Sequence, residues 1–243
     1  MKEVLNKKGK GYSKIRVIFA TLCFVVGAFL LLLNPIRNIM LSNKVDNMYT
    51  AASGLSAEEF AKNAQTEASY DYSDVQPVSM ENVIEAAKTK VNVPSIGLIS
   101  VPELGIKLSI NHGATNVTML YGAGTIKPQK MGEGNYALAS HSVNSYGGEN
   151  MLFTPLWRAQ KGMKVYLTDG AKVYTYTIDE TFMVSPSDTW VLDETKDSTV
   201  TLITCDVSTF KRVIIKGKLD SVKSMDDTDE SVLKSFNLAA RTF

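Results

Sequence analysis

The sequence predicts an all-β domain, a closed barrel of seven or eight short strands with short helices, preceded by an N-terminal transmembrane helix. Three observations support this prediction. From about residue 92 to residue 222, short segments rich in β-forming residues alternate with turn residues. Only brief helical patterns interrupt them, and many short strands with few helices are typical of barrels. An uncharged run of seventeen residues, 17–33, precedes the domain.

The N-terminal region has the charge pattern of a membrane anchor. Residues 1–16 hold six cations and one carboxylate, a net +5, so the remainder carries −4 of the overall +1. The run 17–33 is at the short end for a helix that crosses a bilayer. Because the cations precede it, the positive-inside rule puts the N-terminus in the cytoplasm and the barrel outside the cell. A cleaved signal peptide is the alternative, but "NPIRN" (34–38) is a poor cleavage site.

Residues 34–76 are predicted to form an extracellular stalk. Pro35 is expected to end the anchor helix. A short polar helix follows, in which Ser56 and Glu59 have the spacing of a capping box. "SYDYSDVQPVS" (69–79) is typical of a loop, and "SMENVIEAAKTK" (79–90) predicts a short helix that leads into the barrel.

The barrel is predicted to occupy residues 77–222, followed by a C-terminal tail over 223–243. "GNYALASHS" (134–142) has the pattern of a buried strand that ends in polar residues. Residues 163–185 predict a hairpin with Asp169-Gly170 as its turn. Further strands are predicted in 95–110, 198–205 and 211–219, and short helical segments in 116–122, 149–162 and the tail.

Charge and motifs exclude several classes of protein. A mildly acidic body gives no electrostatic reason to expect a nucleic-acid partner. The sequence has no nucleotide-binding, EF-hand or zinc-ligand spacing.

The predicted barrel contains one cysteine, Cys205. Disulfides are allowed outside the cytoplasm, but the only other cysteine, Cys23, lies in the anchor, where it is expected to act as a small apolar residue. Cys205 ends a predicted strand, and Arg212 begins the next if the polar segment between them forms a hairpin. A nearby permanent cation lowers the pKa of a thiol and stabilises an oxyanion. A buried structural cysteine is the alternative.

The sequence contains two histidines, and one of them has the position of a functional group. His141 ends the strand "NYALAS" beside a polar, glycine-rich loop, where a side chain is displayed rather than buried. His112 lies in a predicted turn and is expected to be a solvated surface histidine. Cys205, His141 and Arg212 all lie at strand ends, so together they indicate a catalytic site.

These residues resemble the sortases of Gram-positive bacteria, in particular the class A, or housekeeping, members of the streptococcal type. The likeness covers most of the chain from the anchor onward. It is carried by "GNYALASHS", "LFTPL", "TLITC", "RVIIKGKL" and "SVLKSFN". "TLxTC" with a downstream arginine and an upstream histidine is a specific combination. "LAS" before the histidine, where many relatives have "AG", is a minor departure.

The resemblance implies a sortase-type β-barrel and a cysteine transpeptidase that cleaves LPxTG-type sorting signals between Thr and Gly. It assigns Cys205 as the nucleophile, His141 as the general acid and base, and Arg212 as the clamp for oxyanion and substrate. The backbone N–H of Asp206 is a candidate second oxyanion donor. The other matching positions are Thr204 beside the reaction centre, and Ala139, Ile203 and Ile214 in the groove for the Leu-Pro of the signal.

The resemblance also implies the partners: surface proteins that carry the signal and an amine of the cell-wall precursor lipid II. The sequence offers no clear counterpart of the calcium-binding carboxylates of some class A members, so no cofactor and no metal are expected. The sequence leaves two alternative functions open. One is a hydrolytic cysteine peptidase, although the papain and caspase signatures are absent. The other is a non-catalytic, membrane-anchored β-module.

Overall fold

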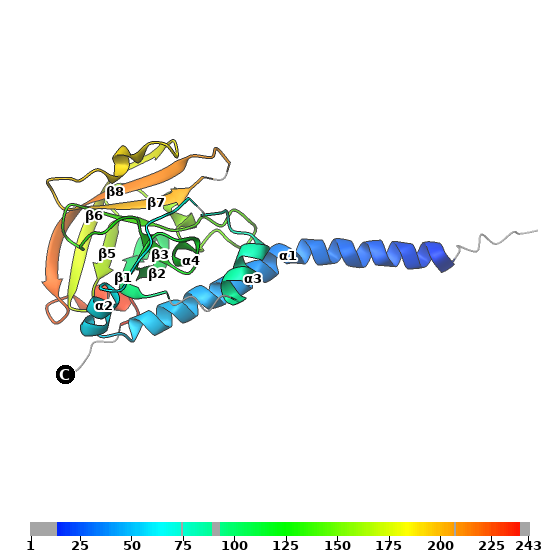
Figure 1. Cartoon of the computed structure of the whole chain (residues 1–243), viewed down its shortest axis with the longest axis horizontal. Helices are drawn as coiled ribbons and strands as arrows, with labels where there is room; N and C mark the ends of the chain where they lie inside the picture. Colours follow the sequence, from blue (N-terminus) through cyan, green and yellow to red (C-terminus); the bar gives the residue numbers. More distant parts are fainter. Residues whose placement is uncertain (1–13, 74, 89–92, 207, 239–243) are drawn as a thin grey trace, which may run out of the picture.

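The computed structural model describes residues 14–73, 75–88, 93–206 and 208–238, and its centre is a closed barrel of eight strands (Figure 1). Around the barrel the strands follow the order β1-β2-β3-β4-β7-β8-β6-β5, and β5 pairs with β1 to close it. The predicted closed barrel is therefore confirmed. The strands are β1 (Ser95–Val101), β2 (Ile106–Asn111), β3 (Ala123–Thr125), β4 (Asn135–Ala139), β5 (Lys164–Thr168), β6 (Lys172–Val184), β7 (Thr199–Cys205) and β8 (Arg212–Ser224).

Apolar side chains fill the barrel and hold its strands rigidly. Leu138 of β4, Leu202 of β7 and Ile215 of β8 are almost fully buried in one core cluster. Interiors of this kind are close-packed, so they position the strand ends with little freedom. The predicted hairpin is present as β5 and β6, with Asp169 and Gly170 in its turn. Gly170 has a φ of +83°, a conformation that favours glycine.

Two neighbouring strands, β4 and β7, run parallel, so their carboxyl ends meet at the same edge of the barrel. Ala139 pairs with Ile203 in this register. The alignment continues beyond β4, because the N–H of Ser140 donates to the carbonyl of Ile203 at 3.1 Å. His141 and Cys205 each follow this pair by two residues, so both are brought to the same edge of the barrel.

The anchor helix is longer than the sequence predicts. α1 (Lys14–Ser53) is one helix of 40 residues, and Pro35 lies inside it. The prediction that Pro35 ends the helix is wrong. An internal proline costs about 3 kcal/mol. Burial of Leu41 and Val45, each at most 8% exposed, offsets this cost, because full burial of such a side chain contributes about 1.5–3 kcal/mol.

The two halves of α1 have different surroundings. The N-terminal half projects away from the barrel, exposes its apolar side chains, and is long and apolar enough to cross a membrane (Figure 1). The C-terminal half packs on the barrel. Arg37 donates to the hydroxyl of Ser145 at 2.6 Å and to the carbonyl of Val78 at 3.1 Å. Residues 37–53 therefore belong to the folded body rather than to a separate stalk, because Leu41, Val45 and Tyr49 form an apolar stripe at helical spacing.

The remaining helices are short and lie outside the barrel. They are α2 (Ala57–Asn63), α3 (Met80–Lys88), α4 (Asn116–Leu120) and α5 (Glu230–Ser235), with 3-10 turns η1 (Pro102–Leu104), η2 (Thr154–Arg158) and η3 (Thr189–Leu192). The predicted capping box is confirmed at α2. The N–H of Ser56 donates to the carboxylate of Glu59 at 2.8 Å, and the N–H of Glu59 donates to the hydroxyl of Ser56 at 3.3 Å.

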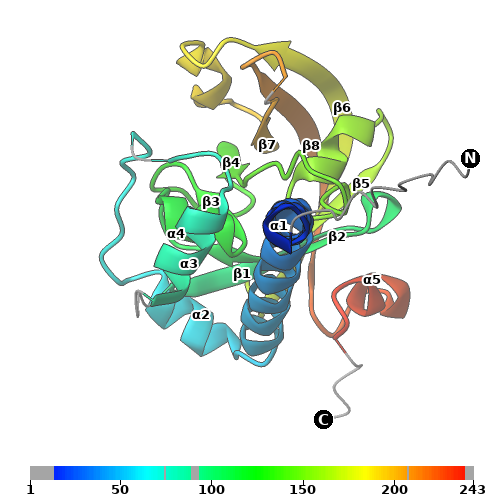
Figure 2. The ribbon, with the colours of Figure 1, turned by 90° about the vertical axis from the view of Figure 1, so that its right-hand side faces the viewer.

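The C-terminal segment packs against the body. β8 continues to Ser224, so the predicted tail begins inside a strand. α5 follows, and Phe236 just after it is fully buried in a cluster with Tyr49 of α1 and Phe60 of α2. In Figure 2, which looks along α1, α2 and α5 lie on either side of that helix. Residues 239–243 of the predicted tail and residues 1–13 of the basic N-terminus lie outside the described residues.

Candidate active site

Cys205 and Arg212 face each other across the β7–β8 hairpin. They are partners in the antiparallel register, as the sequence predicts. The charge of the Arg212 guanidinium acts on the Cys205 thiol across this pair and favours the thiolate. Asp206 fixes the connection between the strands, since its carboxylate accepts from the N–H of Ser208 at 2.8 Å and from the hydroxyl of Thr209. The thiol and the guanidinium are thus held together by backbone pairing rather than by flexible side chains alone.

The backbone N–H of Asp206 is not free to bind an oxyanion. It donates to the carbonyl of Lys211 at 2.8 Å. This hydrogen bond extends the β7–β8 ladder by one step past the Cys205–Arg212 pair. The expected role of Asp206 as an oxyanion donor is therefore corrected, because the hairpin already uses that N–H.

His141 lines the same groove as this pair but is deeply buried. Its side chain is 5% exposed, so the expectation that the residue is displayed at the surface is wrong. The residues around it are fixed by hydrogen bonds. The hydroxyl of Ser140 donates to the carbonyl of Gly122 at 2.6 Å, and the N–H of Phe153 donates to the carbonyl of His141 at 3.2 Å. The imidazole Nε2 is 3.1 Å from the Oδ1 of Asn116.

One groove of about 390 Å³ contains all the residues that the family resemblance assigns to the site. His141, Cys205 and Arg212 line it with Ala139, Ile203, Thr204, Asp206 and Ile214. Apolar clusters below Ile203 and Ile214 give the groove a hydrophobic floor. The hydroxyl of the buried Thr204 donates to the carbonyl of Ser140 at 2.9 Å, which ties the strand of Cys205 to the segment of His141.

Two walls of the groove were missed by the sequence analysis. One is the segment before α3, where Tyr72, Val75, Gln76 and Pro77 line the groove. The other is the connection between β6 and β7, which contributes residues from Val184 to Leu192. Neither has a local motif that marks it as part of a site, since each is brought there by packing against distant strands.

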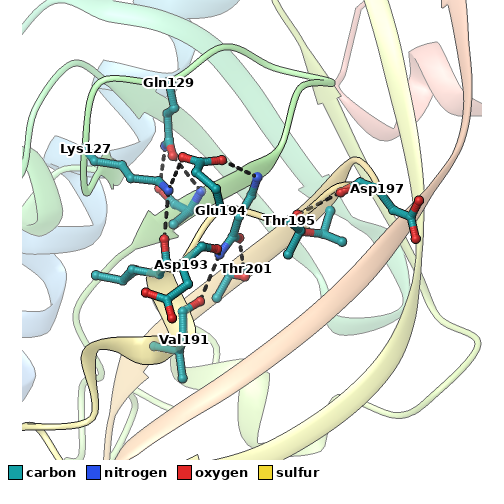
Figure 3. A network of polar contacts seen from close by, with 12 residues as sticks. Lys127, Gln129, Val191, Asp193, Glu194, Thr195, Asp197 and Thr201 are labelled. Carbon is teal, nitrogen blue, oxygen red and sulfur yellow. Dashed lines mark hydrogen bonds and ion pairs between the residues drawn. The ribbon is translucent and has the colours of Figure 1, made fainter.

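A polar network holds the second wall in place (Figure 3). Lys127 Nζ donates to the carbonyl of Leu192 at 2.8 Å and forms an ion pair with Glu194 at 2.6 Å. The side-chain amide of the buried Asn135 donates to the carbonyls of Val191 and Asp193, each at 2.9 Å. Among the residues that the structure describes, no group of three or more His, Cys, Asp or Glu side chains has a metal-binding arrangement.

The environment favours the neutral forms of both catalytic candidates. Burial lowers the pKa of His141 to about 4, and a hydrogen bond with the backbone of Asn116 opposes this shift. Burial raises the pKa of the Cys205 thiol, while the neighbouring Arg212 acts in the opposite direction. Both shifts favour the neutral thiol and the neutral imidazole over the thiolate–imidazolium pair.

The comparisons with known proteins identify the family. A family model described as the sortase domain matches residues 99–220. Sortase A of Streptococcus agalactiae serotype III (strain NEM316) is 40% identical over 238 residues, 96% of this chain and 96% of that protein. The chain belongs to the sortase family.

Further relatives agree with this assignment. Sortase A of Listeria monocytogenes serovar 1/2a is 37% identical over 172 residues, 70% of this chain and 76% of that protein. A crystal structure of Listeria monocytogenes sortase A has a TM-score of 0.54 and 39% identity, and covers 58% of this chain and 97% of its own. This sortase is therefore a cysteine transpeptidase of the cell-wall sorting type, and the apolar half of α1 fits a membrane anchor.

The pKa of Cys205 gives a prediction for this sortase. In a Cys23→Ala background, Cys205 is the only thiol. We expect its alkylation by iodoacetamide to rise with pH and to reach half its maximal rate above the pH of a free thiol, about 8.5, because burial raises the pKa. The measurement is the alkylation rate between pH 6 and 11 by mass spectrometry. A midpoint below that of free cysteine would contradict the raised pKa.

His112 gives a second prediction. Its Nε2 is 3.0 Å from the hydroxyl of Tyr70, and it lines a cavity separate from the groove of Cys205. The substitution His112→Ala should leave the rate of transpeptidation close to that of the parent. Loss of the Tyr70 hydrogen bond should lower the free energy of unfolding by about 0.5–1.5 kcal/mol. Steady-state kinetics and thermal unfolding measure both effects, and an inactive His112→Ala variant would mean that His112 takes part in the reaction.

Proposed function

We propose that this sortase cleaves LPxTG-type sorting signals between Thr and Gly and joins the surface protein to an amine of the lipid II cross-bridge. Cys205 is the nucleophile, His141 the general acid and base, and Arg212 the clamp. The observation that carries the proposal is that Cys205, paired with Arg212 across β7 and β8, lines a single groove together with His141. Ala139, Ile203 and Ile214 in the groove floor suit the Leu-Pro of the signal.

The first half of the reaction forms a thioester. The Cys205 thiolate attacks the carbonyl carbon of the signal's Thr, and negative charge develops on the carbonyl oxygen. Arg212 stabilises this oxyanion, since it is a permanent cation beside the sulfur. The bond between Thr and Gly then breaks, and protonated His141 gives its proton to the departing glycine amine. The products are an acyl-enzyme thioester on Cys205 and the released C-terminal fragment.

The second half transfers the acyl group. The acceptor amine attacks the thioester carbonyl, His141 takes a proton from it, and the Cys205 thiolate leaves. One amide bond has been exchanged for another, and the thioester has conserved the acyl bond energy. The reaction therefore balances without a nucleotide, a redox cofactor or a metal.

The location of the barrel suits substrates at the outer leaflet. We infer that the N-terminus is cytoplasmic, because the cations precede the apolar run 17–33. Arg37 already contacts the barrel, and it follows that run by four residues, about 6 Å along a helix. The barrel then lies close to the membrane, next to a membrane-held surface protein and a lipid-linked amine. Tethering raises the effective concentration of the enzyme for both.

Mass spectrometry of the full chain in detergent tests the proposal. The protein is incubated with an LPETG-type peptide, with and without triglycine as the amine. We expect a thioester adduct on Cys205 and, with triglycine, an amide product. A free acid alone in both reactions would support a hydrolytic peptidase. Neither adduct nor product, with Cys205 unreactive toward iodoacetamide, would support a non-catalytic β-module.

A further inference from the structure

Asn116 is held rigidly next to the imidazole of His141. It is the first residue of α4, and Thr115 caps this helix. The N–H of Thr118 donates to the hydroxyl of Thr115 at 3.2 Å, and the N–H of Thr115 donates to the hydroxyl of Thr118 at 2.8 Å. The Oδ1 of Asn116 is 3.1 Å from His141 Nε2. A polar side chain on a well-capped helix start is thus aimed at the buried general acid.

The contacts of Asn116 also determine which nitrogen of His141 carries the proton. The backbone N–H of Gln76 is 3.4 Å from the same Oδ1 atom. A backbone N–H can only donate, so the atom that it meets is an acceptor, the carbonyl oxygen of the amide. His141 Nε2 must then be the donor, and the neutral imidazole is the Nε2–H tautomer. Nδ1 remains the nitrogen with the free lone pair.

We propose that Asn116 is a positioning residue for His141, which fixes the ring as the Nε2–H tautomer and leaves Nδ1 to exchange the proton with the substrate amine. The inference rests on the proposed role of His141 as general acid and base. In the imidazolium form, Nε2–H still donates to Asn116, and the proton on Nδ1 is the one delivered to the leaving amine. When the second amine attacks, Nδ1 takes the proton back.

Asn116 is the side-chain hydrogen-bond partner that stabilises the charged ring of His141. The titratable groups that share the groove with His141 are Tyr72, Asp188, Cys205, Asp206 and Arg212. Asp206 accepts from Ser208 and Thr209, and Asp188 accepts from the N–H of Ser185. Among the described residues, Asn116 is the one side chain with a hydrogen bond to the His141 ring. Because an ionised donor strengthens a hydrogen bond, this contact favours the imidazolium over the imidazole.

The tautomer is directly measurable because the chain has only two histidines. In a His112→Ala background, the full chain in detergent is labelled with ¹⁵N-histidine, and its ¹⁵N NMR spectrum near neutral pH reports on His141 alone. We expect the Nε2–H tautomer in this background and a mixture of tautomers when Asn116→Ala is added. A parent spectrum of the Nδ1–H tautomer, or an Asn116→Ala spectrum unchanged from the parent, would overturn the proposal.

Kinetics of two Asn116 variants separate positioning from a purely structural role. We expect Asn116→Ala to lower kcat about tenfold with little change in KM. Asn116→Asp keeps an acceptor oxygen and adds a negative charge, which raises the pKa of His141. That variant should therefore retain activity to within a few fold, and the acid limb of its pH–rate profile should move to higher pH. A variant that merely damaged the groove would lose activity without moving the limb.

Asn82→Ala is the matched control. Its side-chain amide donates to the carbonyl of Pro77 at 2.9 Å, and it neither lines the groove nor contacts His141. Parental kcat and acid limb are expected for it. If Asn116→Ala also kept parental kcat while Cys205→Ala was inactive, the role of Asn116 would be wrong and the transpeptidase function would stand. If the parent made no amide product, the proposed function itself would fail.

Discussion

Substitution of Cys205 by alanine is expected to abolish transpeptidation, lowering turnover by a factor on the order of 10⁴ or more. Both halves of the reaction pass through a thioester on this sulfur, and no other described side chain in the groove carries a thiol. The fold should persist, because Cys205 is only partly buried and its backbone pairing with Arg212 does not depend on the side chain. Mass spectrometry of the peptide reaction measures the loss, and thermal unfolding measures the stability.

The second cysteine supplies the control for that experiment. Cys23 is exposed in the apolar half of α1, away from the groove. Cys23→Ala should keep parental activity, and the double substitution should match Cys205→Ala. Cleavage of an LPETG-type peptide by Cys205→Ala at even a tenth of the parental rate would contradict the assignment of the nucleophile.

The sequence predicted the barrel well because its strands carry local signals. The Asp169-Gly170 turn fixes the β5–β6 hairpin, and the apolar runs around Cys205 and Arg212 fix β7 and β8. The parallel pairing of β4 with β7 has no such signal. It joins Ala139 to Ile203 across 64 residues of chain, so it depends on how the whole barrel closes. The proximity of His141 to Cys205 was expected from strand ends and family resemblance, and its geometric cause became visible only in the fold.

The error at Pro35 has a similar origin. Proline is a local signal that opposes a helix, and taken alone it predicts a helix end at this position. The apolar stripe of Leu41, Val45 and Tyr49 becomes favourable only when a barrel is present to cover it. Tertiary packing thus outweighs the local preference of proline. Residues 37–53, which were expected to form part of a stalk, pack on the barrel instead.

The chemistry of the site was predictable only in part. Residue types and the family motif singled out Cys205, His141 and Arg212. The burial of His141 and its contact with Asn116 depend on α4, which lies 25 residues earlier in the sequence. The use of the Asp206 N–H by the hairpin likewise follows from three-dimensional pairing rather than from any motif.

Substitution of Arg212 by lysine is expected to lower kcat about 10²–10³-fold, the loss typical of removing one oxyanion donor. Lysine keeps the positive charge, but a guanidinium offers a planar fork of donors that an ammonium cannot reproduce. The shorter reach from β8 also moves the charge away from the position held by the guanidinium opposite Cys205. Steady-state kinetics with an LPETG-type peptide and triglycine measure the effect.

Two further measurements separate the charge of Arg212 from its geometry. Arg212→Ala removes a cation that lowers the pKa of Cys205, so the pH midpoint of alkylation should rise, whereas Arg212→Lys should leave it closer to the parental value. Lys211→Ala is the matched control, because that side chain is exposed and its backbone carbonyl still accepts from Asp206. It should keep parental turnover. The clamp role requires the planar guanidinium to bind the oxyanion, which lysine cannot do. Near-parental kcat in Arg212→Lys would therefore show that a positive charge alone suffices, and it would contradict the clamp role.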